Sequence, residues 1–146
     1  MNYAPILGPV VALIAWSMVM WIWLYATRLP AMRRAGIELK GRVGSRGADL
    51  DGKIEDKVQW KAHNYNHLME QPTLFYAVAI GLAMMGDHDP GTTYFGWAYV
   101  GLRVAHSLVQ ATVNIVKYRL ALFMLSSIVL ILLTIRLAAI VARASG

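Results

Sequence analysis

A run of polar side chains stands at the head of an apolar stretch and could form one wall of a ligand site. His63, Asn66, His67 and Glu70 supply two imidazoles, an amide and a carboxylate close together in the sequence. In an α-helix, a rotation of 100° per residue places His63, His67 and Glu70 within a narrow arc of one face. Because polar groups are costly inside a bilayer, these side chains indicate a ligand or a polar partner.

A second set of polar residues follows further along the chain with helical spacing. Arg103, His106, Gln110, Asn114 and Lys117 are 3, 4, 4 and 3 residues apart, which confines them to about 80° of a helix circumference. An arginine within a membrane normally faces the interior of a bundle or an aqueous cavity, where it finds a partner. We therefore expect this stripe to face inward.

Glu70 is the natural partner for Arg103, since the two would lie at similar depth in antiparallel helices. We expect an ion pair between them, with His67 and His106 nearby, and loss of stability in Glu70→Gln. Such a pair could serve only to hold helices together. The surplus of donors at the same end, which includes Arg119, favours an anionic polar ligand that enters from the cytoplasm.

Metal and thiol chemistry are limited by the residues available. His63 and His67 are four residues apart and could ligate a metal ion, but we interpret them as hydrogen-bonding groups and predict no metal site. The chain has no cysteine, which excludes a disulfide framework and a protein thiolate nucleophile. Any thiol chemistry must use a thiol brought by the substrate.

The composition indicates a single-domain membrane protein that comprises residues 1–146. Hydrophobic residues make up 58% and charged residues 15% of the chain, with a mean hydropathy of +0.48; soluble domains are nearer 45–50% and 25%. The net charge is +6, but the charges cluster in loops. They therefore report membrane topology, and we predict no nucleic-acid partner.

Four apolar stretches, at about 10–27, 62–86, 93–113 and 120–141, can cross roughly 30 Å of hydrocarbon. The loop 28–61 carries nine basic and five acidic residues, which favours a cytoplasmic position. The sequence thus predicts an all-α four-helix membrane bundle with both termini outside. Pro72 should kink the second span, and Arg136 should snorkel near the outer end of the fourth.

Two motifs resemble the MAPEG family (membrane-associated proteins in eicosanoid and glutathione metabolism), particularly its bacterial branch. They are Asn64-Tyr65-Asn66-His67-Leu68-Met69-Glu70-Gln71-Pro72 and Arg103-Val104-Ala105-His106-Ser107 continuing to Arg119. The resemblance implies a homotrimer in a bacterial inner membrane, surrounded by lipids. Glutathione would bind between subunits near the cytoplasmic face as co-substrate, and a lipophilic electrophile or hydroperoxide would arrive from the membrane.

The resemblance also implies roles for individual residues. Arg119 matches the arginine that stabilises the glutathione thiolate at the start of the fourth helix, and a guanidinium favours that charged form. Glu70 matches the second-helix glutamate that holds glutathione. The remaining residues that the resemblance assigns to glutathione binding are His63, Asn66, His67, Arg103, His106, Gln110 and a loop arginine, either Arg33 or Arg34.

The chain departs from the pattern of MAPEG enzymes at three positions. Gln110 stands where they often carry tyrosine, His67 where they have asparagine, and Leu120 where some have serine. Two interpretations therefore stay open. One is a glutathione transferase or peroxidase, and the other is a non-catalytic protein of the same fold that binds a lipid or a membrane-protein partner.

Overall fold

Helices are the only regular secondary structure in the part of the chain that the structure describes. The computed structural model describes residues 4–41 and 43–145. These residues form five α-helices, one 3-10 helix (η1) and no strand. The elements in order are α1 (Leu7–Arg34), η1 (Gly47–Leu50), α2 (Asp56–Leu68), α3 (Gln71–Met84), α4 (Pro90–Thr112) and α5 (Val116–Ala144). The predicted all-α class is confirmed.

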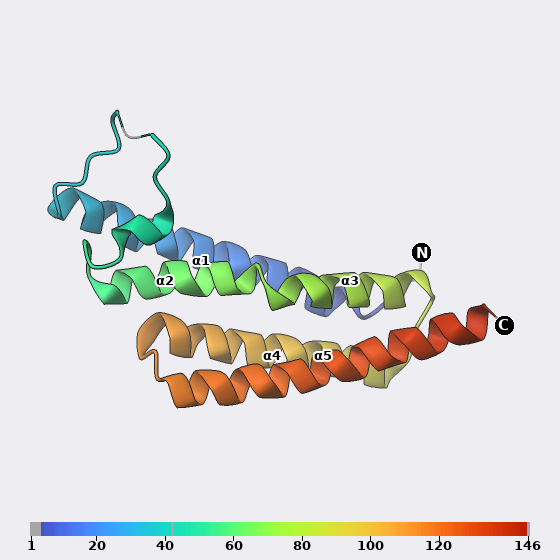
Figure 1. The fold of residues 1–146 in the computed structure, drawn as a ribbon. Helices are drawn as coiled ribbons and strands as arrows, with labels where there is room; N and C mark the ends of the chain where they lie inside the picture. Colours follow the sequence, from blue (N-terminus) through green and yellow to red (C-terminus); the bar gives the residue numbers. More distant parts are fainter. Residues whose placement is uncertain (1–3, 42, 146) are drawn as a thin grey trace.

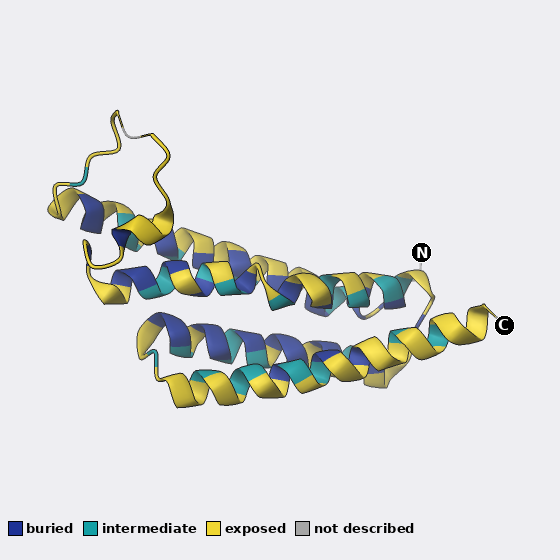
Figure 2. Cartoon of the chain, viewed as in Figure 1, coloured by how far each residue is buried: buried dark blue, intermediate teal, exposed yellow. Residues whose placement is uncertain are grey.

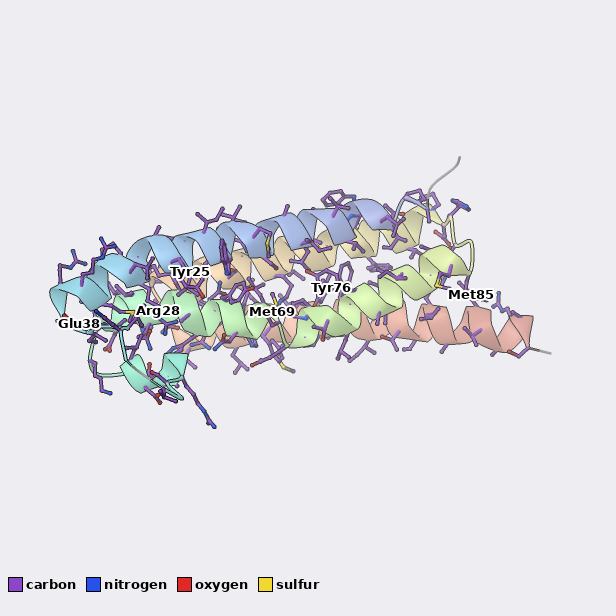
Figure 3. The ribbon with its side chains drawn as sticks, turned by 90° about the horizontal axis from the view of Figure 1, so that it is seen from above. Tyr25, Arg28, Glu38, Met69, Tyr76 and Met85 are labelled. Atoms are coloured by element: carbon purple, nitrogen blue, oxygen red, sulfur yellow. The ribbon has the colours of Figure 1, made fainter. Side chains whose placement is uncertain are left out.

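The helices form an elongated bundle in which α2 and α3 follow one another end to end (Figure 1), with a bend between them that Figure 3 shows. Together they occupy the place of one helix beside α1, while α4 and α5 lie against them as a second pair. The described chain begins and ends at one end of the bundle. The long connection 35–55 and the short turn between α4 and α5 lie at the other end (Figure 1).

The core lies between these helices and is built from large apolar side chains. The rings of Phe75 and Tyr99 stack with centroids 4.4 Å apart and planes 15° apart. Burial is concentrated on the facing sides, whereas α5 is mostly exposed outward (Figure 2). Apolar residues such as Ile131, which is 56% exposed, cover that outer side. The principal buried residues are Ile6, Leu13, Phe75, Ala79, Leu82, Tyr99, Val100, Leu130 and Leu133.

Pro72 divides the stretch 62–86 into two helices, a stronger effect than the kink expected from the sequence. Pro72 lies in the first turn of α3, and Glu70 precedes that helix with φ −91° and ψ −100°. Proline supplies no amide donor and clashes with a helix that would continue into it. The chain therefore leaves the helix at Met69, near the middle of the bundle (Figure 3).

Arg136 is held by two carboxylates of the α3–α4 turn, although the sequence predicted that it would snorkel. Its Nε and Nη2 donate to Asp87 at 3.1 and 3.0 Å, and Nη2 lies 3.1 Å from Asp89. The Asp87 side chain is 3% exposed and also accepts from Thr92 Oγ1 at 2.9 Å. The hydrogen bonds from Arg136 are the main reason that the pKa of Asp87 lies below its ordinary value.

A hydrogen-bond network fixes the connection 35–55 against α1 and α2. Arg28 Nη2 donates to Gln59 Oε1 at 2.9 Å and to the carbonyl of Gly47 at 2.8 Å. Gln59 Nε2 donates to Asp51 Oδ1 at 2.5 Å. This bond, followed by the nearby His63, lowers the pKa of Asp51. The end of α1 that carries this network lies beside the start of α2 (Figure 3).

Candidate functional site

The interruption between α2 and α3 brings the carboxylate of Glu70 back onto the imidazole of His67. His67 Nδ1 lies 2.8 Å from Glu70 Oε2. The His67 side chain is 22% exposed and that of Glu70 is 67% exposed. In a continuous helix, Glu70 would also lie one turn from His67, but here its backbone has left the helix. The pair therefore closes the end of α2.

Arg103, on α4, meets the same turn from inside the bundle. Its Nη2 donates to the carbonyl oxygen of His67 at 3.1 Å. Because α2 ends at Leu68, that carbonyl lacks its regular helical donor and otherwise accepts only a long bond of 3.4 Å from the amide of Glu70. The side chain of Arg103 is fully buried, and its Nε and Nη1 have no hydrogen-bond partner among the described residues. Arg103 thus caps α2 by binding its last turn.

The prediction of an ion pair between Glu70 and Arg103 was wrong within the described residues. No contact of 4.0 Å or less joins the guanidinium to that carboxylate; Glu70 pairs with His67 instead. The reason is the break before Pro72, which turns Glu70 toward the exposed side of His67 while Arg103 reaches the buried backbone of the same residue. His67 therefore stands between the two charges.

Three rings form a compact group around His67. The ring centroids of His67 and His106 are 4.9 Å apart, and those of His67 and Phe123 are 5.4 Å apart. His106 comes from α4 and Phe123 from α5, so three segments of the chain meet here. Their proximity agrees with the expectation that the two polar stripes face each other.

Arg119 enters this group from the first turn of α5. Its Nη1 donates to Asn114 Oδ1 at 2.7 Å, and its Nε is buried without a partner among the described residues. Asn114 adopts φ +54°, a left-handed conformation that asparagine tolerates better than most residues. The turn that reverses the chain between α4 and α5 therefore also supplies the group that orients Arg119.

A cavity of about 230 Å³ lies where these side chains converge. It is lined by His67, His106, Val116, Arg119, Leu120 and Phe123. One guanidinium and two imidazoles thus share a small space with apolar groups. The guanidinium can hold an anion or stabilise a thiolate, and a neutral imidazole beside it can receive a proton.

Comparison with known proteins identifies the family. The sequence model of the MAPEG family matches residues 6–139, nearly the whole chain. The chain belongs to the MAPEG family. No curated protein and no solved structure matches it.

Family membership and the structure together make the chain an integral membrane protein. MAPEG proteins reside in membranes, and α1 and α5 are each long and apolar enough to cross one. Within residues 4–41 and 43–145, no group of three histidine, cysteine or acidic residues is placed to hold a metal ion.

Three other residues of α2 and α4 that the sequence predicted for the site lie outside the cavity of about 230 Å³. His63 faces the loop, where its Nε2 lies 3.3 Å from Asp51, and Asn66 is exposed. Gln110, which replaces the family tyrosine, is buried with Oε1 unpartnered among the described residues. None of the three lines the cavity.

The two loop arginines are at the far end of α1. Arg33 is exposed and lines a separate cavity of about 550 Å³ formed with residues 36–40. Arg34 is exposed and lies 4.0 Å from Glu55. The single chain therefore does not bring either arginine to Arg119.

The interpretation of the sequence missed the contribution of α5 beyond Arg119. Phe123 lines the cavity, and Ser127 accepts a hydrogen bond from Gln71 Nε2 at 2.7 Å. Arg119, Phe123 and Ser127 are four residues apart and share one face of α5. That spacing was visible in the sequence, but the apolar character of the helix obscured it.

Proposed function

We propose that this MAPEG protein binds glutathione in the cavity beside Arg119 and joins it through its sulfur to lipophilic electrophiles, or uses it to reduce hydroperoxides. The observation that carries the proposal is Arg119, which is oriented by Asn114 beside two imidazoles in a cavity of about 230 Å³. Its partly unpartnered guanidinium can hold the thiolate sulfur of glutathione, which is the nucleophilic form.

The walls of the cavity suit the two substrates of such a reaction. Polar groups on one side can receive the tripeptide, while Val116, Leu120 and Phe123 provide an apolar side for a lipophilic molecule. In the transfer, the thiolate forms a bond to an electrophilic carbon, and the bond from that carbon to its leaving group breaks. The leaving group departs with the electron pair.

Glu70 can bind glutathione while it keeps its hydrogen bond with His67. Its Oε2 accepts the hydrogen bond from His67, and its other carboxylate oxygen has no hydrogen-bond partner among the described residues. That oxygen is available to the amino group of glutathione. We propose that His106 and Arg103 complete the polar wall, with the orphaned nitrogens of Arg103 available to an anionic group.

We further propose a homotrimer in a bacterial inner membrane, with the connection 35–55 in the cytoplasm and both termini outside. The common position of the two described chain ends, opposite that connection, supports this topology (Figure 1). A neighbouring subunit could bring its own Arg33, Arg34 or His63 toward the exposed side of Glu70. Residues far from the cavity within one chain would then serve a shared site.

One observation favours a binding protein without catalysis as the second candidate. The described residues that line the cavity include no hydroxyl group, and Gln110 stands where enzymes of the family often carry a tyrosine. A member of this fold that binds a lipid or another membrane protein would not need such a group. Turnover decides between the two candidates.

The test is glutathione binding and conjugation by the purified protein in detergent. Glutathione at about 100 times its Kd should stabilise the fold by roughly 2.7 kcal/mol, seen as a higher Tm. We expect Arg119→Ala to abolish conjugation of a general electrophile and to weaken the stabilisation. Arg143→Ala, at the exposed far end of α5, is the matched control and should behave like wild type. Absence of stabilisation in the wild type would refute the proposal, while binding without turnover would favour the second candidate.

A further inference from the structure

The bond between His67 and Glu70 gives the cavity a base in a defined orientation. An ionised carboxylate only accepts hydrogen bonds, so the nitrogen that contacts Glu70 Oε2 at 2.8 Å must carry the proton. With Nδ1 protonated, the neutral imidazole keeps its lone pair on Nε2. A carboxylate that fixes the tautomer of a histidine in this way is the arrangement used by histidine bases in hydrolases.

The position of His67 allows its free nitrogen to serve the cavity. The ring lines the same 230 Å³ space as Arg119, while Glu70 holds the ring by its Nδ1 edge. Nε2 lies on the opposite edge and has no hydrogen bond to a described residue. The carboxylate approaches from the exposed side of the junction, so it leaves the cavity side of the ring open.

We infer that His67 is the general base that removes the thiol proton of glutathione, and that Glu70 is the residue that positions it. This inference rests on the proposed glutathione function and deepens it. It also explains how a cavity without a hydroxyl group could activate a thiol. The imidazole supplies the acceptor, and Arg119 supplies the charge that holds the product thiolate.

The proton and electron balance of the step is simple. The S–H bond of glutathione breaks, its electron pair stays on sulfur, and the proton forms an N–H bond at His67 Nε2. The imidazolium is stabilised by the carboxylate of Glu70, and the thiolate by the guanidinium of Arg119. After the sulfur attacks the electrophile, the imidazolium returns its proton to the leaving group or to water, which restores the neutral base.

The surroundings of His67 include charged groups of both signs. From α4, Arg103 and His106 face it, and from α5, Arg119 does; both arginines oppose a second positive charge. Glu70 is the carboxylate in contact with the ring, and its negative charge can stabilise the imidazolium. The effectiveness of the base therefore depends on Glu70.

His106 is a poorer choice for the same role. Its ring packs against His67 and Phe123, and within the described chain no carboxylate contacts it. It is 2% exposed, so it is also more deeply enclosed. We therefore place His106 in the wall of the cavity and assign proton transfer to His67.

The experiment measures the pH at which bound glutathione becomes a thiolate, from its ultraviolet absorbance, together with the pH profile of kcat/KM. His67→Gln keeps a polar side chain but removes the base, and Glu70→Gln removes the charge. In both variants we expect the midpoint of thiolate formation to rise by about one pH unit or more. Glu70→Asp, which keeps the charge, should recover part of the shift. In His106→Asn, kcat/KM should fall evenly across pH without a change in midpoint.

The outcomes separate the inference from the function on which it rests. If glutathione binds and its midpoint is the same in wild type, His67→Gln and Glu70→Gln, His67 is not the base, although the proposed function stands. If the wild type does not bind glutathione, both fail. Should His67→Gln fail to fold, Glu70→Gln carries the test, because its side chain is mostly exposed; an unchanged midpoint there overturns the inference.

Discussion

Arg103 donates from Nη2 to the carbonyl oxygen of His67 at 3.1 Å, so a buried arginine caps the helix whose last turn carries the cavity histidine. A cation at a helix C-terminus is favourable because it meets the orphaned carbonyls and the negative end of the helix dipole. The buried core and the cavity are therefore connected through the backbone of one residue.

Replacing Arg103 by methionine should raise the stability of the ligand-free protein. One hydrogen bond to His67 is lost, worth about 1.5–3 kcal/mol, but burial of a guanidinium with two unpartnered nitrogens costs several kcal/mol. We expect a net gain of roughly 1–2 kcal/mol in the free energy of unfolding, measured by thermal unfolding in detergent. Arg103→Lys keeps the charge and should give no gain. A lower Tm for the methionine variant would contradict this prediction.

Glu70→Gln should leave stability almost unchanged. The carboxylate is 67% exposed and contacts His67 rather than Arg103, so its loss breaks no buried ion pair. We expect the free energy of unfolding to change by less than about 0.5 kcal/mol. Thermal unfolding beside the wild type measures the difference. A large loss of stability would contradict this prediction and would support the ion pair between Glu70 and Arg103 that the sequence suggested.

We expect Asn114 to hold Arg119 in position as well as to form the turn between α4 and α5. Asn114→Gly keeps the left-handed backbone at little cost because glycine adopts positive φ readily, but it removes the bond to Arg119 Nη1. We expect a near-normal Tm with a severalfold loss of conjugating activity. Asn114→Ala loses the same bond and also strains the turn, so its Tm should fall as well. Full activity in the glycine variant would show that Arg119 needs no such support.

The Asp87 cluster should make stability depend on acid pH. Because the folded pKa of Asp87 lies below the ordinary value, its stabilising effect is present above about pH 4 and is lost as the pH falls through the folded pKa. Asp87→Asn should remove this dependence and cost roughly 1–3 kcal/mol near neutral pH. Asp89→Asn keeps an oxygen for the amide of Gly91 and should cost less. Unfolding midpoints measured between acid and neutral pH test both statements.

Gln59 should control the order of the connection 35–55. Gln59→Leu removes its bonds to Arg28, Gly47 and Asp51, and we expect limited proteolysis to cut this connection several times faster. Glu38→Gln, an exposed change in the same segment, is the control and should be cut at the wild-type rate. Equal rates for all three proteins would show that the network does not fix the loop.

Much of the fold could be predicted because hydropathy and charge act over long stretches. The apolar runs that became α1 and α5 needed only their length and composition. The inward direction of the stripe from Arg103 to Gln110 followed from helical spacing, and both residues are buried. The prediction was wrong for the rest of the stripe, because α4 ends at Thr112, Asn114 lies in the turn and Lys117 is exposed. These features do not depend on the detailed conformation of any single residue.

The details of the site could not be predicted because they depend on where helices stop. Pro72 indicated a disturbance, but only the backbone conformation of Glu70 decides that its carboxylate turns to His67. Likewise, the partner of Arg136 required knowledge of the turn at Asp87, since a charge near the end of a span can either pair or reach the interface. The local backbone conformation thus determines which of several polar side chains come into contact.

The interruption at Met69 also has a consequence for how the chain enters a membrane. α3 has 14 residues and a rise of 1.5 Å per residue gives it about 21 Å, well short of roughly 30 Å of hydrocarbon. Among the described helices, only α1 and α5 are long and apolar enough to insert by themselves. We therefore expect α2, α3 and α4 to depend on packing against α1 and α5 for any place in the membrane.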